Sequence, residues 1–267
     1  MLDLSEVKFS RGDILRNVKL PTKITPSLSE LIGIHIGDGS ITDAFKDNVH
    51  TVIEYCGDSL DDLEYYNIYV SSLIEKLFGI QPLFSDHDTW FKLVINSKAI
   101  FKFYTSVIGL PIGKKAQTVT VPTLILNDSN LIITRFLRGL IDTDGSLTFK
   151  KKHKNRHYYP VLKLTLASKE LIKEVNNLLN NLGFVTYSYF DVKRFDSRTN
   201  KTTIIHEIYL YGNKNLERWI KIVGFKNPKH FTKYLIWKKY GFYPPKISHE
   251  QRKKIIQGYL NPEIFYN

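Results

Sequence analysis

The sequence contains a single cysteine, Cys56, among 267 residues. One thiol excludes an internal disulfide framework and a cysteine-rich zinc site. The longest apolar stretch, Leu131 to Ile141, is interrupted by Arg135 and Arg138, and no stretch is long enough to span a bilayer. The first ten residues lack the apolar centre of a signal peptide. We therefore expect an intracellular protein of a reducing compartment, a prokaryotic cytoplasm or an organelle matrix, with no membrane partner.

Acidic residues are scarce in the second half of the chain. Residues 1–125 hold 12 Lys and Arg against 15 Asp and Glu, whereas residues 126–267 hold 26 against 11. The whole chain carries a net charge of +12. This excess predicts a polyanionic partner, and its position predicts that the second half supplies most of the electrostatic attraction. An ordinary lysine-rich surface is the alternative interpretation of the charge alone.

Two stretches of similar sequence divide the chain into comparable halves. "LIGIHIGDGS" occupies residues 31–40 and "LRGLIDTDGS" occupies residues 137–146. Each ends an apolar helical pattern and precedes the same order of expected elements, two strands, a helix, two strands and a helix. The sequence thus predicts an α+β fold built from a duplicated αββαββα unit, with halves at residues 1–125 and 126–267. Ser27 and Glu30 suggest a capping box at the first helix, and residues 193–201 suggest a long loop between the last two strands.

Small residues lie on one face of each repeated helix. Gly33 and Gly37 are four residues apart in the first copy, where Gly139 and Thr143 stand in the second. Small residues at this spacing allow two helix backbones to approach closely, so we expect the two helices to cross and to join the halves. Parallel helices would bring their C-termini together, which predicts that Asp38 and Asp144 lie side by side.

Two neighbouring carboxylates at helix C-termini repel each other unless a cation lies between them. The carbonyl oxygens of Gly37 and Thr143 would add two further oxygen donors. An all-oxygen site favours a hard cation, so we expect Mg²⁺, with Mn²⁺ as a substitute and Ca²⁺ as a non-catalytic occupant. A divalent metal in a basic protein indicates phosphodiester hydrolysis. The competing interpretation is that "DTDG" is only a turn that ends a helix.

These residues resemble the LAGLIDADG homing endonucleases. Leu137 to Gly145, "LRGLIDTDG", departs from the family pattern at two positions, and Leu31 to Gly39, "LIGIHIGDG", departs from it further. The resemblance implies a single-chain pseudo-dimer in which two antiparallel four-stranded sheets form a saddle over DNA. It places the metal-binding carboxylates at Asp38 and Asp144, and we interpret Asp142 as structural.

The resemblance also implies a basic residue near each attacked phosphate. We assign this role to Lys98 and Lys214, with Lys92 and Lys163 as the alternatives. Such a cation would stabilise charge that develops on the phosphate or orient a water molecule. Only weak candidates, Asp58 and Ser168, are found for an additional polar group at the site.

Alternation along the expected strands selects the side chains that would face DNA. A curved antiparallel sheet can enter the major groove, whereas loop lysines and arginines contact phosphates. The predicted DNA-binding residues are Ser40, Thr42, Lys92, Ser146, Thr148, Lys150, Lys152, Lys163, Thr165, Lys193, Arg194, Arg198 and Tyr209.

The resemblance leads to one main hypothesis and two alternatives. The main hypothesis is a monomeric, site-specific double-strand DNA endonuclease with a long target site. Met1 and the ending "FYN" do not match an intein, so we expect a freestanding enzyme encoded within an intron. The alternatives are a splicing cofactor that binds its host intron RNA, and a DNA-binding protein on the same scaffold that no longer cleaves.

Overall fold

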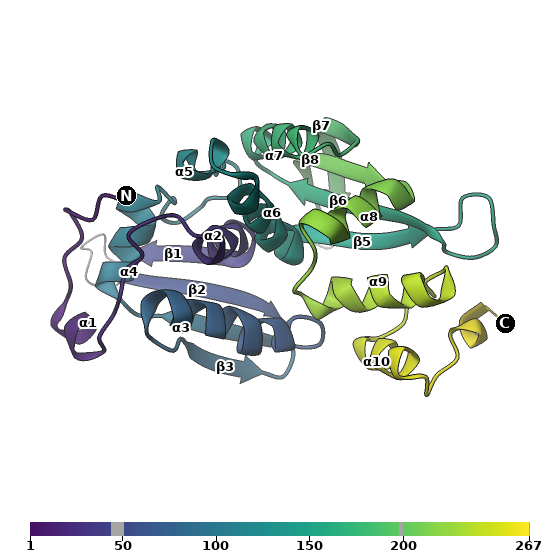
Figure 1. Cartoon of the computed structure of the whole chain (residues 1–267), viewed down its shortest axis with the longest axis horizontal. Coiled ribbons are helices and arrows are strands. Elements are labelled where there is room, and N and C mark those ends of the chain that lie inside the picture. Colours follow the sequence, from purple (N-terminus) through teal and green to yellow (C-terminus); the bar gives the residue numbers. More distant parts are fainter. Residues whose placement is uncertain (44–50, 198–199, 267) are drawn as a thin grey trace.

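The computed structural model describes residues 1–43, 51–197 and 200–266 (Figure 1). A short helix, α1 (Arg11–Leu15), precedes the first repeat. The first repeat comprises α2 (Pro26–Asp38), β1 (Gly39–Asp43), β2 (Thr51–Asp58), the π-helical η1 (Tyr65–Val70) continued by α3 (Ser71–Phe78), β3 (Leu83–His87), β4 (Trp90–Ile95), and α4 (Lys98–Lys102) continued by the π-helical η2 (Phe103–Val107). After α5 (Thr123–Leu126), the second repeat comprises α6 (Asn130–Asp144), β5 (Gly145–Lys150), β6 (Tyr159–Leu166), α7 (Lys169–Asn181), β7 (Thr186–Asp196), β8 (Lys201–Tyr211) and α8 (Gly212–Ile222).

Each repeat forms one antiparallel sheet of four strands. The strand order is β1-β2-β4-β3 in the first sheet and β5-β6-β8-β7 in the second, so the two sheets have the same topology. Alternate residues of the strands pack against the helices, for example Ile53 and Tyr55 on β2 and Leu164 on β6. The duplicated α+β fold predicted from the sequence is confirmed.

Helices α2 and α6 pack side by side at the centre of the molecule, with a sheet on either side (Figure 1). Both crossing points are glycines. A Cβ atom at Gly33 would lie 2.2 Å from the carbonyl oxygen of Phe136, and one at Gly139 would lie 2.2 Å from that of Glu30. Real side chains do not tolerate such contacts with backbone, so glycine is required at both positions. The close helix pair expected from the small-residue spacing is therefore present.

A buried ion pair also joins the two helices. Arg138 of α6 donates from Nε to Glu30 Oε1 of α2 at 2.7 Å and from Nη2 to Glu30 Oε2, and the Tyr69 hydroxyl donates to Glu30 Oε1 at 2.8 Å. The side chains of Glu30 and Arg138 are 2% and 11% exposed. Because removing one partner leaves the other charge buried and unpaired, each half of the chain depends on the other for this contact.

We expect Arg138→Met to lower the free energy of unfolding by about 3–5 kcal/mol, because Glu30 would remain buried without its partner. The double variant Glu30→Leu, Arg138→Met should recover most of this loss, since it leaves no unpaired charge. Urea unfolding of the two single variants and the double variant measures the coupling. Equal losses in Arg138→Met and in the double variant would show that the ion pair does not couple the helices.

Two local predictions from the sequence are wrong. The side chain that caps α2 is Thr25, whose Oγ1 accepts from Leu28 N, and not Ser27, because Pro26 occupies the first helical position. Residues 193–196 and residue 201, expected in a long loop, belong to strands. Cross-strand pairs such as Arg194 with Thr203 extend β7 to Asp196 and β8 from Lys201.

A C-terminal segment follows the second repeat and returns to the first half. It comprises α9 (Pro228–Tyr240), α10 (His249–Gln257) and the 3₁₀ helix η3 (Pro262–Tyr266). Helix α10 begins with a capping box formed by Ser248 and Gln251. Three side chains of this segment form ion pairs with the acidic turn after β2, namely Lys229 with Asp62, Arg252 with Asp61 and Lys253 with Glu64. Among the described residues, no helix is long and apolar enough to cross a membrane.

Candidate functional site

The C-termini of α2 and α6 meet where the helices pass into β1 and β5. A Cβ atom at Gly37 would lie 2.0 Å from Thr143 Oγ1 and 3.4 Å from Asp144 Oδ2. Asp38 and Asp144, the last residues of the two helices, are near enough for the charge of Asp38 to add to the effect of burial on the pKa of Asp144. The structure therefore brings the two predicted carboxylates together, one from each half.

Both carboxyl groups are held in an environment that disfavours their charge. Burial raises the pKa of Asp144 to about 7, and the neighbouring charge of Asp38 acts in the same direction. Burial also raises the pKa of Asp38, although the Tyr66 hydroxyl donates to Asp38 Oδ2 at 2.7 Å and opposes this effect. A carboxyl group whose pKa rises on folding costs stability as the pH rises from its unfolded-state pKa to its folded-state pKa. A cation between the carboxylates would relieve that cost.

Two lysines that no sequence pattern singled out lie at the ends of the same helices. Lys115 Nζ donates to the carbonyl oxygens of His35 at 2.9 Å, of Ile36, and of Gly37 at 2.7 Å. Lys229 Nζ donates to the carbonyl oxygen of Thr143 at 3.2 Å, at the end of the second helix. Both ammonium groups act against the rise that burial causes in the pKa of the two carboxyl groups. Each of the two helix ends thus has its own lysine.

The two lysines are held differently. Burial lowers the pKa of Lys115 to about 8, while the charges of Asp144 and Asp38 oppose this shift. Lys229 is shared between the helix end and the turn after β2, where its Nζ lies 3.0 Å from Asp62 Oδ1. The first lysine follows the first repeat, and the second follows the second repeat at the start of α9. This correspondence is the signal in the sequence that could have identified both.

The structure does not bring Lys98 or Lys214 to the carboxylates. Gly39, next to Asp38, pairs with Tyr55 of β2, and Tyr55 pairs with Leu93 of β4. From Leu93 the chain runs along the rest of β4 before it reaches Lys98 at the start of α4. Lys214 lies in the first turn of α8, beyond the end of β8. The catalytic role assigned to these two lysines stays a prediction without a contact that supports it.

The donors at the helix ends fit a hard cation. They are two carboxylates and the carbonyl oxygens of Gly37 and Thr143, and here these carbonyls accept from Lys115 and Lys229. Within the described ranges, no group of three or more His, Cys, Asp or Glu side chains is placed to hold a metal ion. The four donors at the helix ends are all oxygen atoms, a chemistry that suits Mg²⁺, Mn²⁺ or Ca²⁺.

Asp142, two residues before Asp144, is used for structure. Its side chain is fully buried and Oδ2 accepts from the backbone N–H groups of Lys226 at 2.7 Å and Asn227 at 3.2 Å. Burial raises its pKa to about 8. These contacts fix the turn that leads into α9, and therefore the position of Lys229.

The two weak polar candidates serve local structure. Ser168 caps α7 and donates to the carbonyl oxygen of Val119. Asp58 is exposed, and its Oδ1 accepts from the backbone N–H group of Leu60 in the turn after β2. Neither contact involves the carboxylates at the helix ends.

The predicted DNA-facing residues on β1, β4, β5, β6 and β8 lie on the faces of the two sheets turned away from the helices. On β7, Arg194 pairs with Thr203 on this face, whereas the adjacent Lys193 pairs with Ile204 on the opposite face. Strand register aligns Ser146 with Lys163 and Lys163 with Tyr209, and it aligns Ser40 with Glu54. Thr42, Thr148 and Lys150 are exposed, and Lys152 lies in the hairpin after β5 with Nζ 4.2 Å from the ring centre of Tyr159. Lys193 and Arg194 belong to β7 rather than to a loop. Arg198 lies outside the described residues.

Ion pairs at equivalent positions of the two sheets have opposite polarity. On the first sheet Lys92 of β4 pairs with Glu54 of β2 at 2.6 Å. On the second sheet Lys163 of β6 pairs with Glu207 of β8, also at 2.6 Å. The two predicted groove lysines are therefore partly neutralised by glutamates of the neighbouring strands. Since the polarity is reversed, the two sheets present different charge patterns despite their shared topology.

Tyrosines cover the exposed face of the second sheet. The rings of Tyr209 and Tyr211 on β8 stack at 5.3 Å, and they contact Tyr189 and Tyr187 on β7 at 5.6 and 5.4 Å. Lys163 Nζ lies 5.0 Å from the centre of the Tyr209 ring. Tyrosine hydroxyls combined with lysines give this surface both hydrogen-bonding groups and positive charge, as a nucleic-acid interface requires.

Comparison with known proteins identifies the fold. Residues 132–224 match the family model described as a LAGLIDADG-like domain. The homing endonuclease I-DmoI, solved in complex with DNA and Mn, is 16% identical and aligns with a TM-score of 0.50 over 76% of this chain and 98% of its own. A point mutant of I-SmaMI is 16% identical with a TM-score of 0.50, over 81% of this chain and 90% of its own.

Most of this chain matches a small part of each of several longer curated relatives. The glutamine–fructose-6-phosphate aminotransferase of Methanocaldococcus jannaschii is 27% identical over 209 residues, which is 78% of this chain but 17% of that protein. The replicative DNA helicase DnaB of Rhodothermus marinus is 24% identical over 220 residues, which is 77% of this chain but 21% of that protein. Because these proteins have different activities and the match covers a small part of each, their activities are not assigned to this chain.

Proposed function

Because the chain carries a LAGLIDADG-like domain and has the fold of the LAGLIDADG homing endonucleases, we propose that it is a site-specific endonuclease that cuts both strands of DNA. The observation that carries the proposal is the pair Asp38 and Asp144. One carboxylate comes from each half, and both lie at helix ends beside lysines. The charge of Asp38 adds to the rise in the pKa of Asp144, so the two carboxylates lie close together. Two turns that only ended their helices would not require this proximity.

Asp38 and Asp144 would hold the divalent cation, with the carbonyl oxygens of Gly37 and Thr143 as further donors. We propose Mg²⁺ as the ion, with Mn²⁺ as a substitute and Ca²⁺ as a non-catalytic occupant. The bound ion supplies an activated water and neutralises charge on the phosphate. Lys115 and Lys229 place a positive charge at each helix end, where they bind and orient the attacked phosphates. As both halves belong to one chain, a monomer is sufficient.

The exposed faces of the two sheets would bind the duplex in its major groove. The second sheet contributes tyrosines and lysines, and its hairpin after β5 adds Lys151, Lys152 and Lys154. The first sheet contributes less charge, because Lys92 is the one basic residue among its predicted DNA-facing side chains and is paired with Glu54. The second half therefore supplies most of the salt-dependent affinity.

Incubation with Mg²⁺ and a randomised duplex library, followed by sequencing of the cut ends, tests the proposed function. We expect cuts in both strands that define one long target sequence. Retention of one sequence without cutting in either Mg²⁺ or Mn²⁺ would contradict the endonuclease and favour a DNA-binding protein that does not cleave.

Lys115→Met and Lys229→Met are each expected to slow cleavage of one strand by roughly 10²-fold, because a preorganised charge beside the phosphate is lost. Strand-specific labels on a target duplex report the two rates separately. The exposed neighbour Lys114 provides the matched control, and Lys114→Met should cleave at the wild-type rate. If Lys98→Met and Lys214→Met caused larger losses than Lys115→Met and Lys229→Met, the assignment made from the sequence would be preferred.

A further inference from the structure

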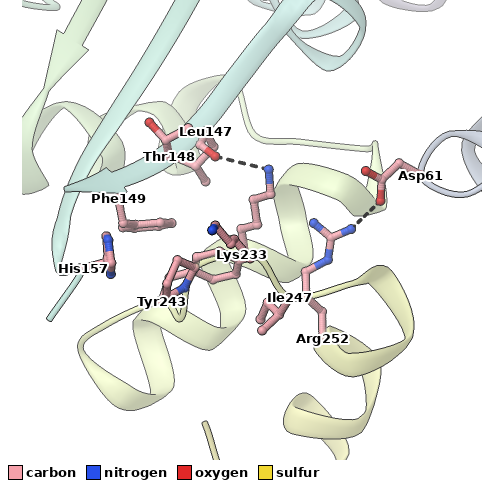
Figure 2. A pocket seen from close by; sticks show the side chains of 11 residues that line it. Asp61, Leu147, Thr148, Phe149, His157, Lys233, Tyr243, Ile247 and Arg252 are labelled. Carbon is pink, nitrogen blue, oxygen red and sulfur yellow. Dashed lines mark hydrogen bonds and ion pairs between the residues drawn. The ribbon is translucent and has the colours of Figure 1, made fainter. Parts of the chain in front are cut away.

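A cavity of about 400 Å³ lies between the edge of the second sheet and the C-terminal segment. Figure 2 shows that it is lined by Leu147, Thr148 and Phe149 of β5, by Lys233 of α9 and Arg252 of α10, and by Asp61 from the turn after β2. Thr148 belongs to the exposed sheet face, so the cavity adjoins the proposed DNA-binding surface. Nothing in the proposed cleavage chemistry uses it.

Lys233 of α9 extends its side chain through this cavity (Figure 2). Its Nζ makes one long hydrogen bond, to the carbonyl oxygen of Leu147 at 3.4 Å. Burial lowers the pKa of Lys233 to about 8, and the nearby Arg252 contributes to the shift. Among the described residues no carboxylate lies within ion-pair distance of this ammonium group. Because an ammonium group has three donors, two of them have no protein acceptor in this part of the structure.

A second cation in the wall is also incompletely satisfied. The side chain of Arg252 is 3% exposed, and its Nη2 pairs with Asp61 Oδ1 at 2.6 Å. Its Nε is buried and has no hydrogen-bond partner among the described residues. Its Nη1 donates to the carbonyl oxygen of Lys229 at 3.4 Å. Counting Lys246, which lines the cavity but is exposed, three cations and one carboxylate surround it. A buried charge without a partner is costly, which indicates that an anion from outside the chain completes the site.

We propose that the cavity binds a phosphate group between Lys233 and Arg252. The position of Lys233 suggests the source of that phosphate. Lys233 lies one helical turn after Lys229, so the Cβ atoms of the two lysines are roughly 6 Å apart on one face of α9. Lys229 in turn contacts the carbonyl oxygen of Thr143, beside Asp144. On the proposed function, the cavity would hold a backbone phosphate next to the one attacked by the second half.

The segment that follows Lys115 offers no counterpart to Lys233. Lys115 is followed by residues 116–122, "AQTVTVP", which contain no lysine or arginine. The phosphate site therefore anchors the duplex at one half only, and it would fix the orientation in which an asymmetric target binds.

Thermal unfolding with inorganic phosphate, at ionic strength held constant with chloride, tests the site. We expect phosphate to raise the melting temperature of the wild type and of Lys238→Met, which removes an exposed lysine from the same helix. The variant Lys233→Met should not respond to phosphate. Without phosphate it should melt at or above the wild-type temperature, because an unpaired buried charge is gone. No response in the wild type, or an equal response in Lys233→Met, would overturn the proposal.

Binding to a random-sequence duplex identifies the source of the phosphate. If it belongs to the DNA backbone, Lys233→Met should reduce the slope of log affinity against log salt by about one, and Lys238→Met should not. Equal slopes, combined with a phosphate response that requires Lys233, would support the site and identify free phosphate as its ligand. A wild type that binds no duplex would count against the proposed function and leave the phosphate result intact.

Discussion

Asp38→Asn or Asp144→Asn is expected to abolish double-strand cleavage, with a loss of roughly 10³-fold or more, because several kcal/mol of metal-dependent charge stabilisation disappear with the ligand. Duplex binding should change little, since neither residue lies on the exposed sheet faces. Cleavage of a target duplex with Mg²⁺, together with its binding in Ca²⁺, measures both effects. Asp128→Asn, in the exposed link between the repeats, is the control. Unchanged cleavage by both active-site variants would refute the site.

The stability of Asp144→Asn distinguishes loss of a ligand from loss of the fold. Burial and the charge of Asp38 raise the pKa of Asp144 to about 7, so in metal-free buffer the wild type loses stability as the pH rises from the unfolded-state value towards 7. The variant has no such loss. Metal-free Asp144→Asn should therefore melt above the wild type at pH 8, and the difference should shrink towards pH 5.

Gly33→Ala and Gly139→Ala are expected to disrupt the protein most severely. The new methyl group would lie 2.2 Å from a backbone carbonyl oxygen of the facing helix, and no side-chain rotation can relieve that contact. We expect each variant to lose about 4 kcal/mol or more of unfolding free energy, or not to fold. Urea unfolding followed by circular dichroism measures the loss.

A glycine outside the helix crossing provides the control for these variants. In α1 a Cβ atom at Gly12 would meet only Ser10 Oγ at 3.8 Å, so Gly12→Ala should keep or slightly raise the wild-type stability. Wild-type stability in Gly33→Ala as well would show that the helices are not in contact at that point.

The sequence was sufficient for those features that depend on local pattern. Repeated strand and helix signals predicted the duplicated fold, and glycines four residues apart predicted the helix crossing that brings the carboxylates together. Helix α9 was missed although its signals were present. Asn227 caps it, Pro228 begins it and Gly241 ends it in a left-handed conformation. A helix interior rich in lysine and aromatic residues gave no clear amphipathic period.

Contacts between distant segments could not be predicted from the sequence. Lys115 reaches the end of α2 from a loop about 80 residues later, and Lys229 reaches the end of α6 from a helix that lies outside the repeat. Each of these lysines follows the last helix of its repeat, but nothing in the local composition separates it from the other basic residues. The same holds for Glu54 and Glu207, whose pairing with Lys92 and Lys163 depends on strand register.

The glycine crossing has a consequence for the substrate. Because backbone meets backbone at Gly33 and Gly139, the protein cannot adjust the separation of Asp38 and Asp144 to suit a relaxed duplex. On the proposed function, the DNA itself would deform to place both scissile bonds at the helix ends. Flexible pyrimidine–purine steps cost less to deform, so base pairs that no side chain touches would still influence which sites are cut.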